Sequence, residues 1–206
     1  NPHFLYNTLE AIQGIALEKE VPEIADASGA LGKLLRHNIQ GSDTVSLNRE
    51  LEITEAYLTI QKLRFTDKLN VIISVRENTR KLPVMKLLLQ PLVENAVYHV
   101  LEPKTGPGTL YIGARIEESD LLISIYDDGV DIPAEKLSEL QENLDRAPQS
   151  LRSAKVHIGL LNVQNRIRLR YGKPYGLSLE STPGKGTNVI LRLPVETEKE
   201  DGTKEC

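Results

Sequence analysis

The chain has 206 residues, of which 40% are hydrophobic, and this is enough for one ordinary domain or two small ones with their own cores. Its formal net charge of -4 argues against a general nucleic-acid surface, because such a surface relies on many Lys and Arg contacts to phosphate. Cys206 is the only cysteine, so an internal disulfide framework is excluded and a reducing compartment such as the cytoplasm is expected.

Membrane association is expected only through a segment outside this sequence. No apolar run approaches the roughly 20 residues of a membrane-spanning helix, and no signal peptide is recognisable. The chain begins with Asn1 instead of Met, which is typical of a piece excised from a longer protein. We therefore expect any membrane anchor to lie upstream.

Residues 1–66 predict a helical region. The first helix, over residues 1–20, is indicated by apolar residues close to the 3.6-residue period, namely Leu5, Leu9, Ile12 and Ala16. A second helical stretch covers residues 22–39, and a third begins after Ser46, a suitable N-cap. Since residues 41–43 form a turn, the last two helices make a hairpin. A lone hairpin buries little, so a four-helix bundle across a dimer axis is expected.

A second domain, over residues 67–195, is predicted to open with the strand "LNVIISV". The stretch "LPVMKLLLQPLVENAVYHVL" predicts one long helix that Pro91 kinks from within. "TLYIGARIE" and "LLISIYD" predict two strands that are joined as a hairpin.

The remainder of this domain predicts two helices and two strands. A weak helix and a flexible stretch occupy residues 134–155, and the next helix, "GLLNVQNRIRLRYG", ends at Gly172. "YGLSLEST" and "TNVILRLP" predict strands that flank "PGKG". The mixed order indicates an α+β sandwich, with a mostly antiparallel sheet and helices on one face. Residues 196–206 form a charged tail that we expect to be disordered.

Two stretches carry acidic and amide side chains suited to nucleotide chemistry. Glu94 and Asn95 lie in a predicted helix with His99 one turn later, where they could hold a hard cation or orient a water, or simply form a solvated helix face. Asp127 ends a strand and Gly129 follows it, which suits a carboxylate acceptor for an exocyclic amine but also an ordinary acidic turn.

Two further stretches are rich in glycine. Gly159 precedes a helix, so backbone amides there could bind an anion without positive side chains, or the helix could be capped in the usual way. Gly184 and Gly186 would let the backbone approach a ligand closely or would simply turn between strands.

The order of these stretches is more informative than any one of them. "LVENA", "DDG", "IGLLNVQNRI" and "GKGT" together resemble the asparagine box and the three glycine boxes of the histidine kinase ATP-binding domain, whose class includes DNA gyrase B, Hsp90 and MutL. "NPHFLYNTL", "ELEITEAYLTIQKLRF" and "LPVMKLLLQPLVENA" resemble the phosphoacceptor region of LytS/YesM-type sensor kinases. The resemblance covers residues 1–194. It implies a helical dimerisation region followed by a Bergerat-type ATP-binding fold.

The resemblance implies that His3 is the phosphorylated residue. Imidazole keeps one unprotonated nitrogen near neutral pH, which suits a nucleophile. His3 is two residues before Leu5 and so faces away from that apolar stripe. Asn7, one turn later, could hydrogen-bond to the ring and orient it.

The resemblance also assigns the residues around the nucleotide. Asn95 would bind Mg²⁺, and Glu94 would polarise the attacking imidazole or a water. Asp127 would accept a hydrogen bond from the adenine amino group, and Gly129 would shape its loop. His99 would touch phosphate or ribose, or would be an inert histidine on a helix face.

The two remaining glycine boxes complete the pocket that the resemblance implies. The helix start at Gly159, Leu160 and Asn162 would receive the phosphates, and residues 134–156 would form a lid. The floor of the adenine pocket would be closed by Gly184, Gly186 and Thr187. Three residues depart from the family pattern at positions often filled by glycine, namely Asp131, Lys155 and His157. Lys155 could replace lost amide donors with a positive charge.

The sequence therefore predicts the cytoplasmic catalytic part of a two-component sensor histidine kinase. It would bind ATP and Mg²⁺, phosphorylate itself on His3 within a homodimer, and pass the phosphoryl group to an aspartate in a response-regulator receiver domain. Two alternatives stay open: an ATP hydrolase of the same fold, and a degenerate nucleotide-binding scaffold. Nucleic-acid binding is favoured only by the basic stretch "RIRLRYGK", and this stretch more simply completes an amphipathic helix.

Overall fold

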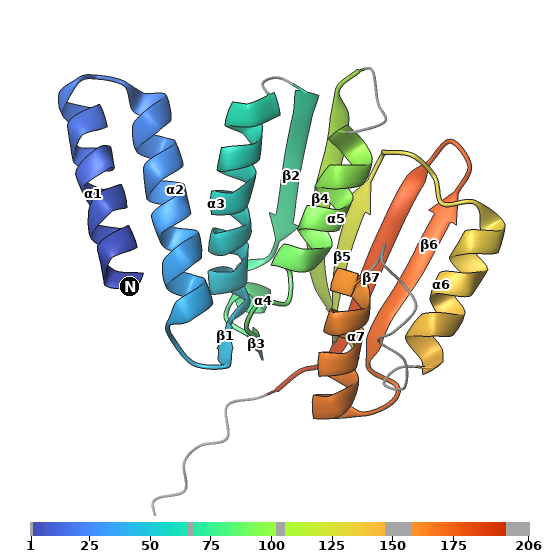
Figure 1. The fold of residues 1–206 in the computed structure, drawn as a ribbon. Helices are drawn as coiled ribbons and strands as arrows, with labels where there is room; N and C mark the ends of the chain where they lie inside the picture. Colours follow the sequence, from blue (N-terminus) through green and yellow to red (C-terminus); the bar gives the residue numbers. More distant parts are fainter. Residues whose placement is uncertain (1, 66–67, 102–105, 147–157, 197–206) are drawn as a thin grey trace, which may run out of the picture.

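The structure, a computed structural model, describes residues 2–65, 68–101, 106–146 and 158–196. Figure 1 shows helices and strands along the whole of this part of the chain. They are, in order, α1 (Pro2–Glu18), α2 (Pro22–Ile39), β1 (Thr44–Ser46), α3 (Leu47–Phe65), β2 (Leu69–Val75), α4 (Glu77–Arg80), β3 (Pro83–Met85), α5 (Gln90–Leu101), β4 (Gly108–Glu117), β5 (Asp120–Asp127), α6 (Ala134–Arg146), α7 (Ile158–Tyr171), β6 (Gly176–Thr182) and β7 (Gly186–Pro194).

The three N-terminal helices pack side by side, as predicted for this region (Figure 1). α2 and α3 share a small apolar cluster of buried side chains, made of Ala30, Leu34, Ile53 and Ala56. Ser46 caps α3, because its Oγ accepts a hydrogen bond from the backbone N–H of Arg49 at 3.2 Å. The cap explains why the chain turns into a helix at this point.

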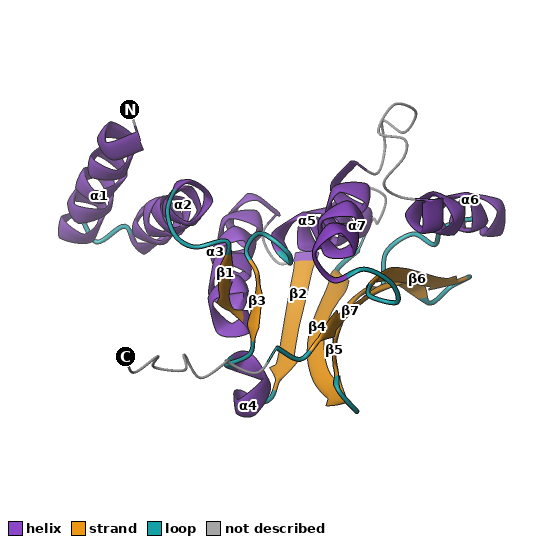
Figure 2. Ribbon diagram, turned by 90° about the horizontal axis from the view of Figure 1, so that it is seen from below, coloured by secondary structure: helices purple, strands orange, loops and turns teal. Residues whose placement is uncertain are grey.

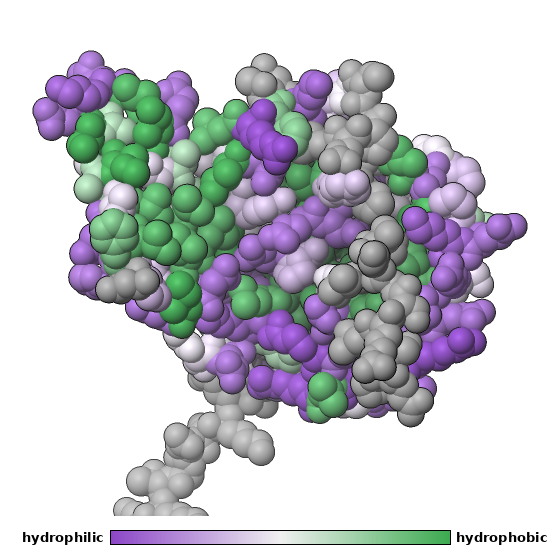
Figure 3. All heavy atoms as spheres, viewed as in Figure 1, coloured by the Kyte–Doolittle hydropathy of each residue, from purple (hydrophilic) through white to green (hydrophobic). Residues whose placement is uncertain are grey.

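α1 buries a different face from the one that its apolar spacing predicts. Its buried residues are Tyr6 and Ala16, whereas Leu5 is 47% exposed and Ile12 is 40% exposed. Further large apolar side chains of α1 and α2 are exposed as well, namely Phe4, Ile15, Leu17, Ile24, Leu31 and Ile39. Figure 3 shows this apolar surface on the side of the molecule where α1 and α2 lie. The two helices thus carry several large apolar side chains that the described part of the chain leaves exposed.

A five-stranded sheet forms the centre of the second half, with the strand order β2-β4-β5-β7-β6. β2 and β4 are parallel, with Leu69 opposite Gly108, and every other neighbouring pair is antiparallel. Figure 2 shows α5, α6 and α7 on one face of the sheet. Alternate residues of the strands point into the core beneath these helices, including Leu110, Ile123 and Leu191. The predicted α+β architecture is confirmed.

The single long helix predicted for residues 82–101 is wrong. Its first part is the strand β3, which pairs with β1 so that Val84 lies opposite Val45, and the helix α5 begins only at Gln90. Pro91 is therefore the second residue of α5 and not a kink within a helix. Proline suits the first helical turn, because the N–H that it lacks would have no partner within the helix there.

α3 belongs to the same core as the sheet. Leu47, Leu51 and Leu58 of α3 lie in the large buried cluster together with residues of α5, α7 and the strands. The β1–β3 pair strengthens this connection, since it joins the residues just before α3 to those just before α5. The domain boundary predicted at residue 66 stays a prediction, and the core itself extends back to Leu47.

The helix α7 ends where the sequence predicts. Gly172 follows α7 with φ +70°, and its N–H donates to the carbonyl of Arg168 at 3.0 Å, which is a glycine C-cap. Of the predicted lid, α6 is described, while residues 147–156 lie outside the described residues, as do residues 197–206 of the predicted tail. Among the helices that the structure describes, none has the length and apolar composition needed to span a membrane.

Candidate functional site

His3 and Asn7 lie one turn apart near the start of α1, and both are exposed. Asn7 Nδ2 is 3.3 Å from His3 Nδ1, so the amide contacts one of the two ring nitrogens. The ring of His3 is thus oriented by its own helix, and it sits at the surface where another molecule can approach it.

The start of α1 is fixed to the end of α2 by polar contacts. Tyr6 donates from its hydroxyl to the Leu35 carbonyl at 3.1 Å, and Arg36 forms an ion pair with Glu10 at 2.9 Å. The Arg36 guanidinium also lies 5.5 Å from the centre of the Tyr6 ring, which is a cation–π distance.

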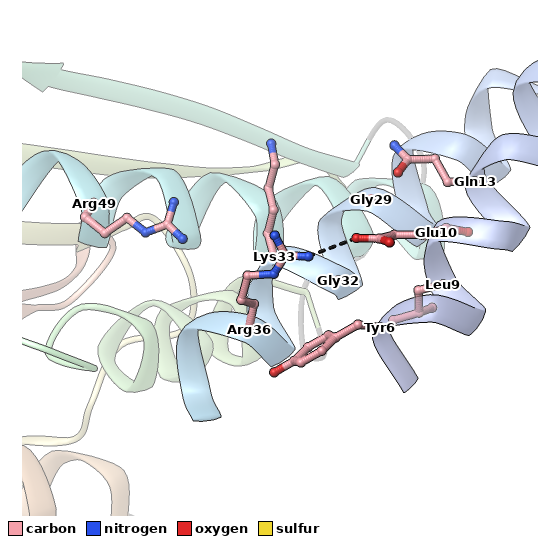
Figure 4. A pocket seen from close by; sticks show the side chains of 10 residues that line it. Tyr6, Leu9, Glu10, Gln13, Gly29, Gly32, Lys33, Arg36 and Arg49 are labelled. Carbon is pink, nitrogen blue, oxygen red and sulfur yellow. Dashed lines mark hydrogen bonds and ion pairs between the residues drawn. The ribbon is translucent and has the colours of Figure 1, made fainter. Parts of the chain in front are cut away.

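A pocket of about 350 Å³ lies beside these contacts and is lined mainly by α1 and α2 (Figure 4). Arg49 is the lining residue contributed by α3, and none of the residues predicted to bind nucleotide lines this pocket. The pocket therefore belongs to the helical region and is separate from the predicted nucleotide site.

α5 carries Glu94 and Asn95 in its second turn. Glu94 is exposed and accepts a hydrogen bond from Gln90 Nε2 at 2.8 Å, while Asn95 is half-buried. Tyr57 of α3 lies close enough to feel the Glu94 charge: burial raises the pKa of Tyr57 to about 12, and the Glu94 carboxylate contributes to the increase. His99 lies in the same helix, and its side chain is outside what the structure describes.

Asp127 ends β5 and is almost fully buried, with 2% of its surface exposed. Its Oδ1 accepts a hydrogen bond from the backbone N–H of Gly129 at 3.0 Å, within the turn that follows the strand. Thr187 of β7 is buried and lies opposite Asp127 in the sheet. The first and third glycine boxes are therefore brought together by strand pairing.

Gly186 shows how close this approach is. Its φ is +82°, and a Cβ added to it would lie 1.9 Å from the Asp127 carbonyl oxygen. No side chain can occupy that space, so only glycine lets the β6–β7 turn contact the end of β5. In Figure 1 both segments lie at the same edge of the sheet, near the C-terminal end of α5.

Asp131 joins the same two loops. Its Oδ2 accepts a hydrogen bond from the N–H of Gly184 at 2.5 Å, and its Oδ1 accepts one from Gly186 at 2.8 Å. These backbone donors hold the pKa of the Asp131 carboxyl below its usual range, the contribution of Gly184 being the largest. The residue that departs from the family pattern thus serves as a clamp on the "GKG" turn, and nothing in its sequence neighbourhood indicates this.

Asp131→Asn is expected to lower the melting temperature of the chain at pH 7, because the carboxylate charge that Gly184 and Gly186 bind is lost. A depressed folded-state pKa stabilises the fold above the unfolded-state pKa, and this contribution disappears as the pH falls through the folded-state value. The difference in melting temperature between the original chain and the variant should therefore become smaller as the pH falls below the ordinary carboxyl value of 3.8. A difference that persists unchanged at pH 3 would contradict the clamp.

Gly159 lies at the start of α7, against the first turn of α5. A Cβ added to it would be 3.6 Å from Cβ of Pro91, an ordinary contact distance. Leu160 is buried in the core and Asn162 is exposed, so of these two only Asn162 presents its side chain to solvent. Lys155 and His157, which precede this helix, lie outside the described residues.

Two buried amide oxygens, one on α5 and one on α7, are not indicated by the sequence. Gln90 Oε1 on α5 and Asn165 Oδ1 on α7 are buried without a hydrogen-bond partner among the described residues. Buried polar atoms are normally paired, so such orphans indicate a place for water, an ion or a ligand. Gln90 also donates to Glu94 one turn later on α5, so an amide and a carboxylate, groups of the kind that Mg²⁺ binds, are adjacent there, although no cluster of three His, Cys, Asp or Glu side chains occurs in the described part of the chain.

The predicted site residues fall into two groups. His3 and Asn7 lie on α1, and the nucleotide residues lie around α5, α7 and one edge of the sheet, with α2 and α3 between the two groups in both ribbon views (Figures 1 and 2). Among the described residues, the predicted phosphoacceptor and the predicted nucleotide residues are therefore not in contact within one copy of the chain.

Two family models match the chain. The histidine kinase model matches residues 1–69, and the model of the histidine kinase-, DNA gyrase B-, and HSP90-like ATPases matches residues 83–197. Among solved structures, the histidine kinase domain of a blue-light activated kinase from Erythrobacter litoralis aligns with a TM-score of 0.54 at 14% identity, covering 94% of each chain. The catalytic domain of the histidine kinase ThkA aligns with a TM-score of 0.52 at 20% identity, over 76% of this chain and 98% of that one. These two structures support the fold.

Relatives in sequence extend over nearly the whole chain. The sensor histidine kinase YesM of Bacillus subtilis is 35% identical over 96% of this chain and 32% of its own length. The sensor protein kinase HptS of Staphylococcus aureus is 29% identical over 94% of this chain and 36% of its own length. The chain thus spans about a third of the length of the relatives that it matches. Since the ATPase model alone matches more than half of it, the chain belongs to the histidine kinase-, DNA gyrase B-, and HSP90-like ATPase family.

Proposed function

We propose that the chain is the catalytic part of a two-component sensor histidine kinase, which phosphorylates His3 from ATP and passes the phosphoryl group to a response-regulator aspartate. The observation that carries this proposal is the convergence of the glycine boxes: the Gly186 backbone packs against Asp127, while Gly159 packs against the first turn of the helix that bears Asn95. Attachment of the whole protein to a membrane through an upstream segment, with this part in the cytoplasm, belongs to the same proposal.

The chemistry of the nucleotide site follows from these residues. The Asp127 carboxylate would accept a hydrogen bond from the adenine amino group, and the backbone N–H groups at the start of α7 would receive the phosphates. Mg²⁺, held by Asn95 with the phosphates, would offset negative charge on the transferred group. Glu94 would polarise the attacking imidazole. Catalysis would therefore consist mainly of positioning and electrostatic stabilisation.

The exposed apolar surface of α1 and α2 supports a dimer. On α1, which carries His3, Phe4 is 66% exposed and Leu17 is 62% exposed, and on α2 Ile24 is 50% exposed. Such a surface is stabilised when a second copy covers it, which gives the four-helix bundle. Because His3 is remote from the nucleotide residues of its own chain, transfer requires either a rearrangement or the nucleotide site of the partner subunit.

The test is incubation of the chain with γ-labelled ATP and Mg²⁺. The proposal predicts label that stays on the protein, resists alkali and is lost in acid, as phosphohistidine is, and that moves to a receiver domain added afterwards. Free labelled phosphate without labelled protein would instead support an ATP hydrolase. Calorimetry with a non-hydrolysable ATP analogue at millimolar concentration tests the other alternative, the degenerate scaffold. A chain of that kind would show no binding of the nucleotide. A version extended upstream of Asn1 provides the comparison for a chain whose first helix is held at its start.

A further inference from the structure

Glu50 is a buried carboxylate for which the proposed mechanism has no use. It lies on α3 with 2% of its surface exposed, and it accepts three backbone hydrogen bonds from one short segment. Its Oε1 is 2.9 Å from the N–H of Leu87, and its Oε2 is 2.8 Å from that of Leu88 and 3.1 Å from that of Leu89. These residues immediately precede α5, so Glu50 fixes the direction in which that helix begins.

His37 provides a fourth partner for the same carboxylate from another helix. Its Nε2 is 3.0 Å from Glu50 Oε1, and both side chains are almost fully buried. His37 lies at the C-terminal end of α2, directly after Leu35 and Arg36, which hold Tyr6 and Glu10 of α1. A continuous set of contacts therefore runs from the helix that carries His3 to the start of the helix that carries Asn95.

The segment Lys86–Leu89 is held from the other side as well. Arg166 of α7 donates to the carbonyl of Lys86 at 2.5 Å and to that of Leu87 at 2.9 Å. Leu87 has φ +57°, a backbone conformation that a leucine adopts only when its surroundings enforce it. Lys86 also donates from Nζ to the carbonyl of Gln40, just beyond the end of α2. α2, α3 and α7 thus all meet at this one segment.

We propose that the segment Lys86–Leu89 is a joint that sets the position of α5 in the nucleotide site, with Glu50 as its positioning residue, and that His37 ties the phosphoacceptor helices to this joint. The inference rests on the proposed function, because it assigns the regulation of that same site. A carboxylate that only stabilised its own part of the fold could take all its hydrogen bonds from one neighbouring segment. Here the four donors come from two parts of the chain that the reaction has to coordinate.

The proposal makes one prediction about nucleotide affinity and a separate one about the rate of labelling from ATP. Glu50→Gln keeps the shape of the side chain but replaces one acceptor oxygen with a donor, so at least one of the three backbone N–H groups loses its partner. We expect at least a fivefold weaker affinity for a non-hydrolysable ATP analogue with Mg²⁺, measured by calorimetry. His37→Leu leaves those three bonds in place, so affinity should stay within twofold while the labelling rate falls at least tenfold.

Matched variants keep the test specific. His37→Gln retains an N–H donor near the position of Nε2 and should restore the labelling rate, which a merely structural role would not require. Thr54→Val, one turn after Glu50 on α3, removes a buried hydroxyl that has no hydrogen-bond partner in the described structure, so it should change neither measurement. If Glu50→Gln does not fold, Arg166→Gln frees the same segment through an exposed side chain and should weaken nucleotide affinity likewise.

The results that would overturn the joint differ from those that would contradict the proposed kinase function. Nucleotide affinity unchanged in a folded Glu50→Gln or Arg166→Gln variant would overturn the joint. A His37→Leu chain that labels as fast as the original would overturn the tie to the phosphoacceptor helices. A chain that binds nucleotide but never labels would contradict the proposed kinase function, while the affinity measurements would still decide the role of Glu50.

Discussion

His3→Gln is expected to abolish the incorporation of label from γ-labelled ATP. Glutamine has a similar size and polarity but no nucleophilic ring nitrogen, so no phosphoramidate bond can form. Nucleotide affinity should be unchanged, because α2 and α3 lie between α1 and the nucleotide residues (Figure 1). Labelling and calorimetry on the same protein preparation therefore separate acceptor loss from loss of the nucleotide site.

Asn7→Ala provides the graded comparison for this variant. Its amide lies 3.3 Å from His3 Nδ1, so its loss leaves the nucleophile in place but removes one contact that orients the ring. We expect slower labelling, by about tenfold or more, since misplaced reacting groups are costly in rate. Label that persists in His3→Gln at the original level would identify another acceptor and would overturn the assignment of His3.

Gly186→Ala is expected to eliminate nucleotide binding. Its φ of +82° already strains any other residue, and the new Cβ would lie 1.9 Å from the Asp127 carbonyl oxygen and 2.8 Å from Cα of Asp128. The start of β7 must then move away from the end of β5, which displaces the carboxylate that would bind adenine. Left-handed strain together with overpacking should cost roughly 2–5 kcal/mol of unfolding free energy. Chemical denaturation and calorimetry measure the two effects separately.

Gly184→Ala separates steric overlap from backbone strain at the same turn. Gly184 also has a positive φ, of +74°, but a Cβ there would meet no atom within 4 Å. We expect only the strain cost of about 1–2 kcal/mol and retained nucleotide binding. Equal losses in the two variants would show that the close contact between Gly186 and Asp127 is not what holds the site together.

Elements with local signals were predictable from the sequence. The N-cap at Ser46, the C-cap at Gly172 and the hairpin between β4 and β5 each depend on residues within a few positions of one another. The contact of Asn7 with His3 is equally local, at one helical turn. The glycine boxes could be found because their order and residue types resemble those of a family, and strand pairing explains why they meet.

Features that depend on distant contacts were not predictable in this way. β1 and β3 have three residues each, too few to show a periodic pattern, and they form because they pair with each other across 37 to 41 positions of sequence. The sequence predicts Pro91 inside a helix because nothing local indicates that the preceding apolar residues form a strand. The roles of Glu50 and Asp131 depend on partners 37 and 53 positions away, so their neighbours in sequence gave no indication of them.

The packing of α3 into the core of the sheet has a mechanical consequence. If α3 moves with the sheet, the phosphoacceptor helices can rotate as a body only about residues 40–43. α2 has 18 residues and is about 27 Å long, and α1 runs back along it, so the Tyr6 end of α1 returns to this pivot. A rotation there would carry the turn after Glu18 through a wide arc and His3 through a short one. If His3 is the phosphoacceptor, rotation about this pivot would therefore move it little, and the proposed transfer would depend mainly on sliding of the helices or on the geometry of a dimer.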